Sequence, residues 1–171
     1  MLMIYQYMKY REYQGEIDFL TGVMGRRLFL QHCQNIQSDQ RIHGHQGWFL
    51  FLDVDWFKQI NDKLGHIAGD ETLKKFAMFL QEQFEPYGAV GRVGGDEFAV
   101  MIEEEMSQEA LEEEMKQFFQ NISGIQKEVT VSCSIGVYRF KYPKTIKELL
   151  TKTDEILYEA KANGRGCFVI R

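Results

Sequence analysis

Residues 89–102 read AVGRVGGDEFAVMI and contain two short apolar runs, 89–93 and 98–102. A polar tip, Gly94-Gly95-Asp96-Glu97, separates them. Short apolar runs bounded by glycine and acidic residues are typical of two strands joined by a hairpin. The stretch therefore predicts a β-hairpin whose tip presents two carboxylates. The two glycines would let a large ligand approach the backbone, although a Gly-Gly pair is equally common in an ordinary hairpin turn.

Helix-like and strand-like patterns alternate on both sides of this hairpin. Trp48–Leu52 is a continuous apolar run, as expected of a strand covered on both faces. Ser107 is placed to cap a helix, and Thr145 and Glu148 form a capping box. In chain order, the expected helices lie at 1–17, 24–35, 57–64, 69–84, 108–122 and 146–160, and the expected strands at 48–52, 89–93, 98–102, 129–137 and 168–170. This order predicts an α+β (α/β layered) domain with helices packed against one sheet.

The composition is that of an ordinary globular domain, with 171 residues, 44% hydrophobic and 26% charged. The net charge of −5 argues against a nucleic-acid binder but leaves room for one nucleotide held by a few cations. No apolar run approaches the ~18 residues of a membrane span, and no secretory signal is recognisable. Three widely spaced cysteines, Cys33, Cys133 and Cys167, predict reduced thiols in a cytoplasmic protein. Anchoring through a region outside this sequence stays compatible with that prediction.

Two acidic clusters are candidates for a metal site. Asp53-Val54-Asp55 directly follows the strand at 48–52, and Asp96-Glu97 lies at the hairpin tip. A strand end and a neighbouring hairpin tip can bring carboxylates close together, and several such oxygens suit Mg²⁺. Such sites hold metal against phosphate oxygens and activate a hydroxyl for in-line attack. Taken singly, each cluster fits better with aspartates that end a strand or fill a turn.

Three cations are candidate phosphate ligands: Lys58, Lys161 and Arg165. Lys161 and Arg165 are four residues apart and share a face if their helix continues that far. Surface lysines and arginines are, however, usually only solvated.

Asn61, His66 and Asp70 follow Lys58 and are candidates for recognising a purine base. An aspartate can accept hydrogen bonds from the N1–H and exocyclic amine of guanine, a donor pattern that adenine lacks. The alternative is loop and cap chemistry, since Asp70 is also favourable in a first helical turn.

Together these residues resemble the GGDEF family of diguanylate cyclases. The match covers about residues 18–170 and rests on five spaced motifs, which makes it specific. The motifs are Asp18-Phe19-Leu20-Thr21-Gly22 with Arg26-Arg27; Leu52–Lys58 with Asn61-Asp62, Gly65-His66 and Gly69-Asp70; Arg92 with Gly94–Phe98; Val129–Ser132 with Ile135-Gly136; and Asp154, Leu157-Tyr158, Ala160-Lys161 and Gly164-Arg165.

The resemblance implies a palm-like, nucleotidyl-cyclase fold with a mainly antiparallel sheet. It implies condensation of two GTP into cyclic di-GMP and two pyrophosphates by a homodimer, each subunit holding one GTP with two Mg²⁺ (or Mn²⁺) ions. By position, Asp53, the Val54 carbonyl and Glu97 would bind metal, and Asp96 would be the general base. Lys58 would assist catalysis by holding phosphates. The substrate-binding residues implied are Asn61, His66, Asp70, Gly94, Gly95, Lys161 and Arg165.

The resemblance also bears on domain organisation and regulation. Residues 1–17 are expected to be a linker or signalling helix below an upstream sensor, and residues 18–171 the GGDEF domain. The family's product-inhibition motif, Arg-x-x-Asp, is missing, since Glu85 and Gly88 occupy its positions. One alternative is an inactive GGDEF domain that senses GTP or docks a partner. Another is a related cyclase with a mixed adenine–guanine product, against which Asp70 argues.

Overall fold

The structure, a computed structural model, describes residues 16–171. Most of the helix expected over 1–17 lies outside this range. Its last two residues are not helical: Glu16 is in a turn, and Ile17 forms an isolated bridge with Met24.

The described elements follow the expected order, except that Met24 and Gly25, expected to begin a helix, form a short strand, and that two short 3-10 helices, η1 and η2, are added. They are β1 (Met24–Gly25), α2 (Arg26–Gln37), η1 (Gln40–Ile42), β2 (Gln46–Val54), α3 (Phe57–Leu64), α4 (His66–Phe84), η2 (Glu85–Tyr87), β3 (Gly88–Arg92), β4 (Glu97–Ile102), α5 (Gln108–Ser123), β5 (Cys133–Lys141), α6 (Ile146–Ala162) and β6 (Phe168–Ile170).

The strands form one six-stranded sheet in the order β1-β3-β4-β2-β5-β6. β2 runs antiparallel to both β4 and β5, and β3 runs antiparallel to β4, while the edge strands β1 and β6 are parallel to their neighbours. The hairpin expected from residues 89–102 is thus present near the centre of a mainly antiparallel sheet, which confirms the predicted fold class.

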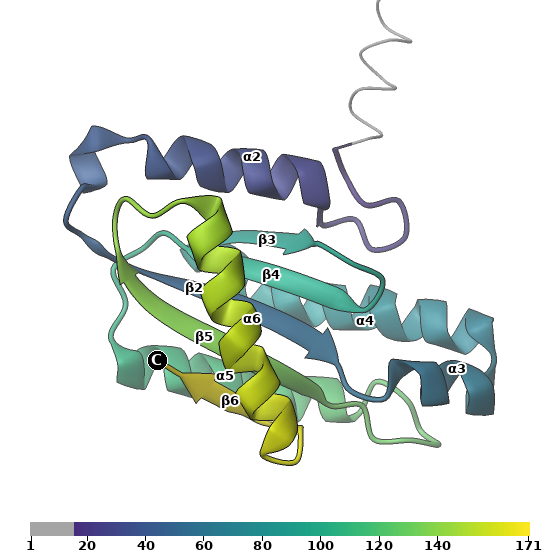
Figure 1. The fold of residues 1–171 in the computed structure, drawn as a ribbon. Coiled ribbons are helices and arrows are strands. Elements are labelled where there is room, and N and C mark those ends of the chain that lie inside the picture. Colours follow the sequence, from purple (N-terminus) through teal and green to yellow (C-terminus); the bar gives the residue numbers. More distant parts are fainter. Residues whose placement is uncertain (1–15) are drawn as a thin grey trace, which may run out of the picture.

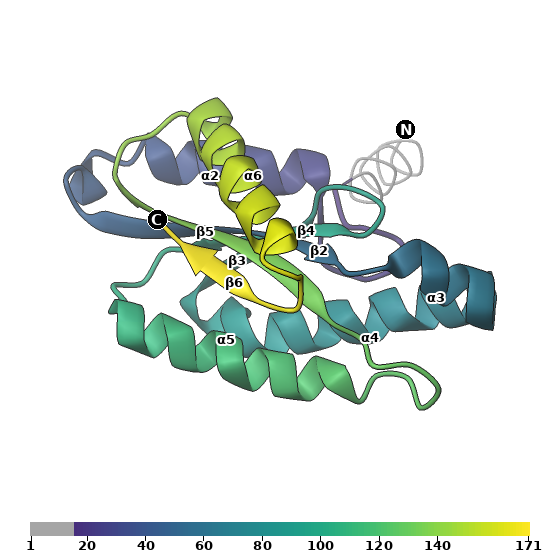
Figure 2. The same ribbon diagram turned by 60° about the horizontal axis from the view of Figure 1, so that its bottom comes forward.

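Helices cover both faces of this sheet (Figures 1 and 2): α4 and α5 lie on one face, and α2 and α6 on the other. Successive side chains of a strand point to opposite faces. Accordingly Trp48, Leu50 and Leu52 join the core below α4 and α5, whereas Phe49 and Phe51 join the core below α2 and α6. This two-sided cover explains why the run Trp48–Leu52 is apolar without alternation. Burial of each such side chain contributes about 1.5–3 kcal/mol to the free energy of folding.

Two helices begin at caps that the sequence predicts, and a third begins earlier than predicted. The Ser107 side chain accepts a hydrogen bond from the Ala110 N–H at 3.2 Å and begins α5. Thr145 and Glu148 form both bonds of a capping box and begin α6. α4 starts at His66 rather than at Gly69, because Gly65 supplies a positive φ of 86° at its N-cap.

The fifth strand differs from the prediction. The alternation of Val129, Val131 and Cys133 predicts a half-buried strand over 129–137, but β5 begins at Cys133 and continues to Lys141. Residues 129–132 are irregular, and the Ser132 carbonyl accepts the Asp55 N–H at 2.9 Å. β5 is buried on both faces over Cys133–Val137, because it lies between β2 and β6 under helices.

Two further expectations are tested by the fold. None of the helices within residues 16–171 combines the length and hydropathy of a bilayer-spanning segment. All three cysteines are free: Cys33 and Cys133 are buried, and Cys167 is partly exposed.

Candidate active site

The two acidic clusters meet at one end of the central strands. Asp53 of β2 lies directly opposite Glu97 of β4 in the antiparallel ladder. Residues in this relation have Cβ atoms about 4.5–5.5 Å apart. Asp96 is joined to the same strand end, because its carbonyl accepts the Val54 N–H at 3.0 Å. The expected meeting of a strand end and a hairpin tip is therefore what the fold produces.

Negative charge at this point is only partly compensated. Burial raises the pKa of Asp53, and the charges of Asp96 and Asp55 raise it further, against an opposing effect of Lys161. Burial also raises the pKa of Glu97, reinforced by Asp53 and Asp96. Each carboxylate thus holds its proton more tightly than in water, mainly because it is buried and further because other acids lie close by.

One cation already contacts the cluster. The Lys161 ammonium lies 2.9 Å from Asp53 Oδ2 and comes from the last turn of α6, whose carboxyl end lies beside the end of β2 (Figure 2). Within residues 16–171, no three His, Cys, Asp or Glu side chains are arranged to hold a metal ion by themselves. A metal here would need the two carboxylates together with backbone or ligand oxygens.

The two hairpin glycines have different surroundings. A Cβ at Gly94 would lie 2.2 Å from Glu97 Oε2, so this glycine makes room for the protein's own carboxylate. A Cβ at Gly95 would meet nothing within 4 Å. Of the two residues expected to leave space for a nucleotide, only Gly95 faces open space.

The hairpin tip is held by residues whose role sequence reasoning did not assign. Arg92 donates to the Gly95 carbonyl and, at 3.0 Å, to Asp18 Oδ1. Arg26 donates to the Val93 carbonyl at 2.9 Å. Burial raises the pKa of Asp18, but hydrogen bonds from Thr21 and Arg92 outweigh it and leave the pKa lowered. Figure 1 shows the tip beside the loop that precedes β1.

The candidate base-recognition residues gather where α3 meets α4. A Cβ at Gly69 would lie 1.8 Å from Asn61 Oδ1, so Asn61 packs directly against the helix that carries Asp70. His66 and Asp70 are exposed and lie one turn apart at the start of α4. Lys58 is exposed on α3, which follows the end of β2. These residues therefore lie on the two helices that directly follow the β2 end of the acidic cluster.

Arg165 does not share a helix face with Lys161. α6 ends at Ala162, and Gly164 has a φ of 110° that breaks the helix. Arg165 instead has a φ of 65°, and its guanidinium carbon lies 4.1 Å from the centre of the Trp56 ring. The glycines on either side of Arg165 were the sequence signal for this break.

Asp55 differs from the other acids of the two clusters. It is 3% exposed and accepts hydrogen bonds from the Ser132 and Ser134 hydroxyls and from the Gly166 N–H. It therefore ties β2 to β5 and to the turn that carries Arg165, rather than facing the open site.

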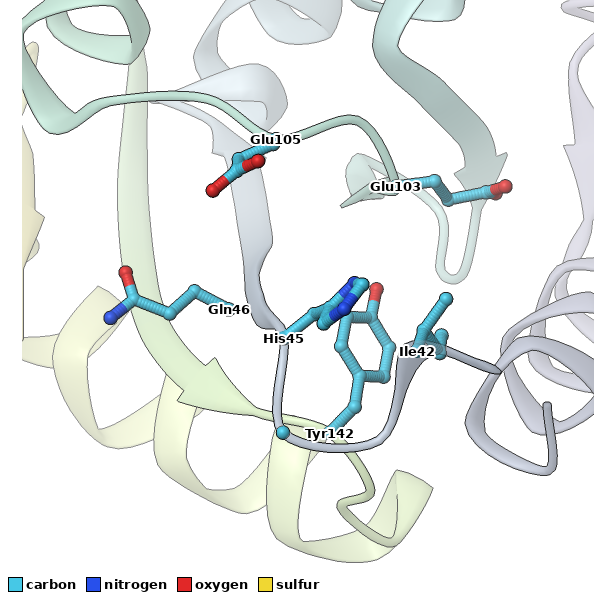
Figure 3. A pocket seen from close by; sticks show the side chains of 7 residues that line it. Ile42, His45, Gln46, Glu103, Glu105 and Tyr142 are labelled. Carbon is cyan, nitrogen blue, oxygen red and sulfur yellow. The ribbon is translucent and has the colours of Figure 1, made fainter. Parts of the chain in front are cut away.

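A pocket of about 380 Å³ lies at the opposite end of β2, lined by His45, Glu105 and Tyr142 among others. Figure 3 shows that its polar side chains do not converge, since Gln46 and Glu103 point in opposite directions. We therefore place the candidate site at the acidic cluster, where charged groups do converge.

Comparisons with known proteins identify the family of this domain. A family model described as "Diguanylate cyclase, GGDEF domain" matches residues 16–167. The chain is 33% identical over 164 residues to diguanylate cyclase DgcS of Shewanella oneidensis, covering 94% of this chain and 55% of that protein. It is 35% identical to diguanylate cyclase TpbB of Pseudomonas aeruginosa, covering 90% of this chain and 37% of that one. The chain thus spans about half or less of these relatives.

Solved structures show the same fold. The isolated GGDEF domain of TpbB from Pseudomonas aeruginosa superimposes with a TM-score of 0.75 at 32% identity, covering 90% of this chain and 93% of that one. Diguanylate cyclase SiaD from the same organism, solved in complex with its activator SiaC, superimposes with a TM-score of 0.83 at 26% identity, covering 99% and 66%. The chain belongs to the GGDEF-domain family of diguanylate cyclases.

Proposed function

We propose that this domain is a diguanylate cyclase, which condenses two GTP molecules into cyclic di-GMP and two pyrophosphates. The 3′-hydroxyl oxygen of each GTP attacks the α-phosphorus of the other, its proton leaves, and pyrophosphate departs in line. The observation that carries the proposal is the opposed Asp53–Glu97 pair, beside Asp96 and Lys161, at the end of the central strands. Named diguanylate cyclases among the relatives support it.

Asp53, Glu97 and the Val54 carbonyl would hold Mg²⁺ or Mn²⁺, two ions per GTP. The residues fit a divalent cation, because two carboxylates lie directly opposite each other on adjacent strands, where burial first and neighbouring acids second raise their pKa values. When bound, such ions stabilise charge on the phosphate oxygens, worth several kcal/mol in a transition state. Lys161 would exchange its present anionic partner, Asp53, for a phosphate oxygen when nucleotide binds.

The remaining roles concern the chain's own side chains. Asp96 would accept the proton of the attacking 3′-hydroxyl. Lys58, Lys161 and Arg165 would hold the phosphates, and Gly95 would let the nucleotide approach the hairpin backbone. Phosphoryl transfer of this kind depends mostly on positioning and charge stabilisation, which acids, cations and an open glycine supply.

Guanine recognition would fall to Asn61 and Asp70, with His66 alongside. The Asp70 carboxylate would accept hydrogen bonds from the N1–H and the exocyclic amine. Its exposed place on the first turns of α4, against which Asn61 packs, supports this role.

Each subunit would bind one GTP, and two subunits would face each other to complete a reaction centre. Incubation with GTP and Mg²⁺ tests both statements when cyclic di-GMP is measured over a dilution series. We expect cyclic di-GMP, with activity per subunit that falls on dilution and rises on fusion to a dimerising coiled coil. GTP that binds without turnover in such forced dimers would favour the alternative, an inactive GTP-sensing or docking domain. Activity per subunit that stays constant far below any dimer dissociation constant would refute the dimer.

A further inference from the structure

Two strained residues lie against each other beside the acidic cluster. Within residues 16–171, Trp56 (φ 57°) and Arg165 (φ 65°) are the non-glycine residues with positive φ. Left-handed backbone is unfavourable for bulky side chains and persists only where the surroundings impose it. Their side chains stack, with the guanidinium carbon 4.1 Å from the ring centre. Two backbone outliers therefore meet in one side-chain contact.

A buried hydrogen bond fixes the same two segments. Asp55, which precedes Trp56, accepts the N–H of Gly166, which follows Arg165, at 2.8 Å. Asp55 is itself held by the hydroxyls of Ser132 and Ser134 at 2.9 and 2.7 Å. The ring and the guanidinium are therefore brought together by neighbouring backbone that is anchored in the core, and not only by their own attraction.

The stack joins the segments that carry Asp53 and Lys161, to which the proposed function assigns metal and phosphate. Trp56 follows Asp53 by three residues, and Lys161, from the end of the same helix that leads to Arg165, contacts Asp53 at 2.9 Å. Stacking occupies a face of the guanidinium and leaves its edge, with its N–H donors, for oxyanions. Arg165 forms no ion pair with any carboxylate of the described chain, so its edge is not committed to a protein anion.

We propose that Trp56 is a positioning residue: its ring holds the Arg165 guanidinium flat and oriented to donate to the β- and γ-phosphates of the nucleotide. This proposal rests on the proposed GTP site. Arginine side chains lose considerable rotamer freedom when they bind, so a guanidinium that is oriented beforehand binds phosphate more tightly. The effect is specific to ligands that carry the terminal phosphates.

Binding without turnover tests this. The affinity of a GTP analogue with a methylene bridge between the α- and β-phosphates would be measured by calorimetry with Mg²⁺, beside that of GMP. We expect Trp56→Leu and Arg165→Ala each to weaken the analogue at least tenfold and to change GMP affinity less than twofold. Trp56→Phe, which keeps a ring, should stay within threefold of wild type. The double variant should be no weaker than Arg165→Ala alone, because both changes remove one interaction.

A matched control is available at the far end of the sheet. Arg139 stacks on Trp48 at 5.1 Å, five residues before Asp53 along β2, so Arg139→Ala removes the same kind of contact and should leave both affinities unchanged. The stack itself is read from fluorescence, since the chain has two tryptophans and Trp48 is buried. Acrylamide should quench Trp56 more strongly in Arg165→Ala than in wild type.

The possible failures are distinct. Three results would each overturn the positioning role while leaving the GTP site intact. They are wild-type affinity in Trp56→Leu, equal losses of affinity for the analogue and for GMP, and effects of the two substitutions that multiply in the double variant. A wild-type protein that protects Trp56 from acrylamide but has no affinity for the analogue would instead refute the proposed function, and this role with it. An enzyme that binds the analogue but makes no cyclic di-GMP would still support the positioning role if the variants behave as expected.

Discussion

Glu97→Gln should make the free domain more stable while abolishing its activity. The substitution keeps the shape of the side chain and removes one of two carboxylates that face each other across β2 and β4. Like charges directly opposite in a sheet are destabilising, and such cross-strand terms amount to roughly 0.2–1 kcal/mol. For a chain of this size that corresponds to a rise in Tm of up to about 4 °C. Loss of a charged metal ligand should lower GTP turnover at least ~100-fold, or about 2.7 kcal/mol.

The stability gain should depend on pH. The pKa values of Asp53 and Glu97 are raised above their ordinary values of 3.8 and 4.5, so the folded state binds these protons more tightly than the unfolded chain. Stability of the wild type therefore declines as pH rises from those ordinary values through the raised ones. The difference between Glu97→Gln and wild type should be small at acidic pH and fully developed near neutrality.

Chemical denaturation without metal or nucleotide, at several pH values, measures the first effect, and cyclic di-GMP formation measures the second. Glu82→Gln, at an exposed position of α4, is the matched control and should change neither quantity. A Glu97→Gln variant that is less stable than wild type at neutral pH would refute the inferred repulsion between the Asp53 and Glu97 carboxylates. Turnover within tenfold of wild type would refute the catalytic assignment.

Three further predictions follow from other parts of the site. Asp70→Ser should reduce the preference for GTP over ATP, because unpaired guanine donors cost about 1–3 kcal/mol of binding free energy. Competition binding with the two nucleotides measures the preference, and an unchanged value would show that Asp70 does not recognise the base. Cyclic di-GMP should not bind tightly away from the active site. Installing Glu85→Arg with Gly88→Asp should not create such binding, because a Cβ at Gly88 would lie 1.9 Å from the Met101 carbonyl oxygen. Calorimetry with cyclic di-GMP in the Glu97→Gln background measures this, and tight binding would contradict the prediction. Asp55→Ala should lower the free energy of unfolding by about 1–3 kcal/mol, because it leaves buried donors unpaired. Chemical denaturation measures this, with Asp62→Ala at an exposed position as the control. Equal stability of the two variants would contradict the anchoring role of Asp55.

Local patterns predict much of this fold because each strand and helix carries its own signal. Residues close together in the sequence determine the hairpin at 89–102, the strand at 48–52 that is covered on both faces, and the caps at Ser107 and Thr145. The start of β5 is decided instead by contacts between Ser132 and Asp55, which are distant in the sequence. The alternation of apolar residues continues across that boundary and gives no sign of it.

The site shows the same division. The meeting of Asp53 with Glu97 follows from strand ends and was predictable, but Asp53 and Asp55 look alike in the sequence, and only burial separates an open carboxylate from an anchoring one. The different surroundings of Gly94 and Gly95 depend on the Glu97 rotamer. Similarly, the stacking of Arg165 on Trp56 needs a helix to end at Ala162 and a turn to bend back.

The contact between Asp18 and Arg92 has a mechanical consequence. Glu16 accepts the Gly25 N–H at 2.7 Å, and two residues later Asp18 holds Arg92, which in turn holds the Gly95 carbonyl. A rotation of the chain at Glu16 would therefore be transmitted to the hairpin tip along this series of hydrogen bonds and along the pairing of β1 with β3. This path contains one partly buried ion pair, Asp18–Arg92, so Asp18→Asn would weaken that link while the bond from Arg26 to the Val93 carbonyl stays in place.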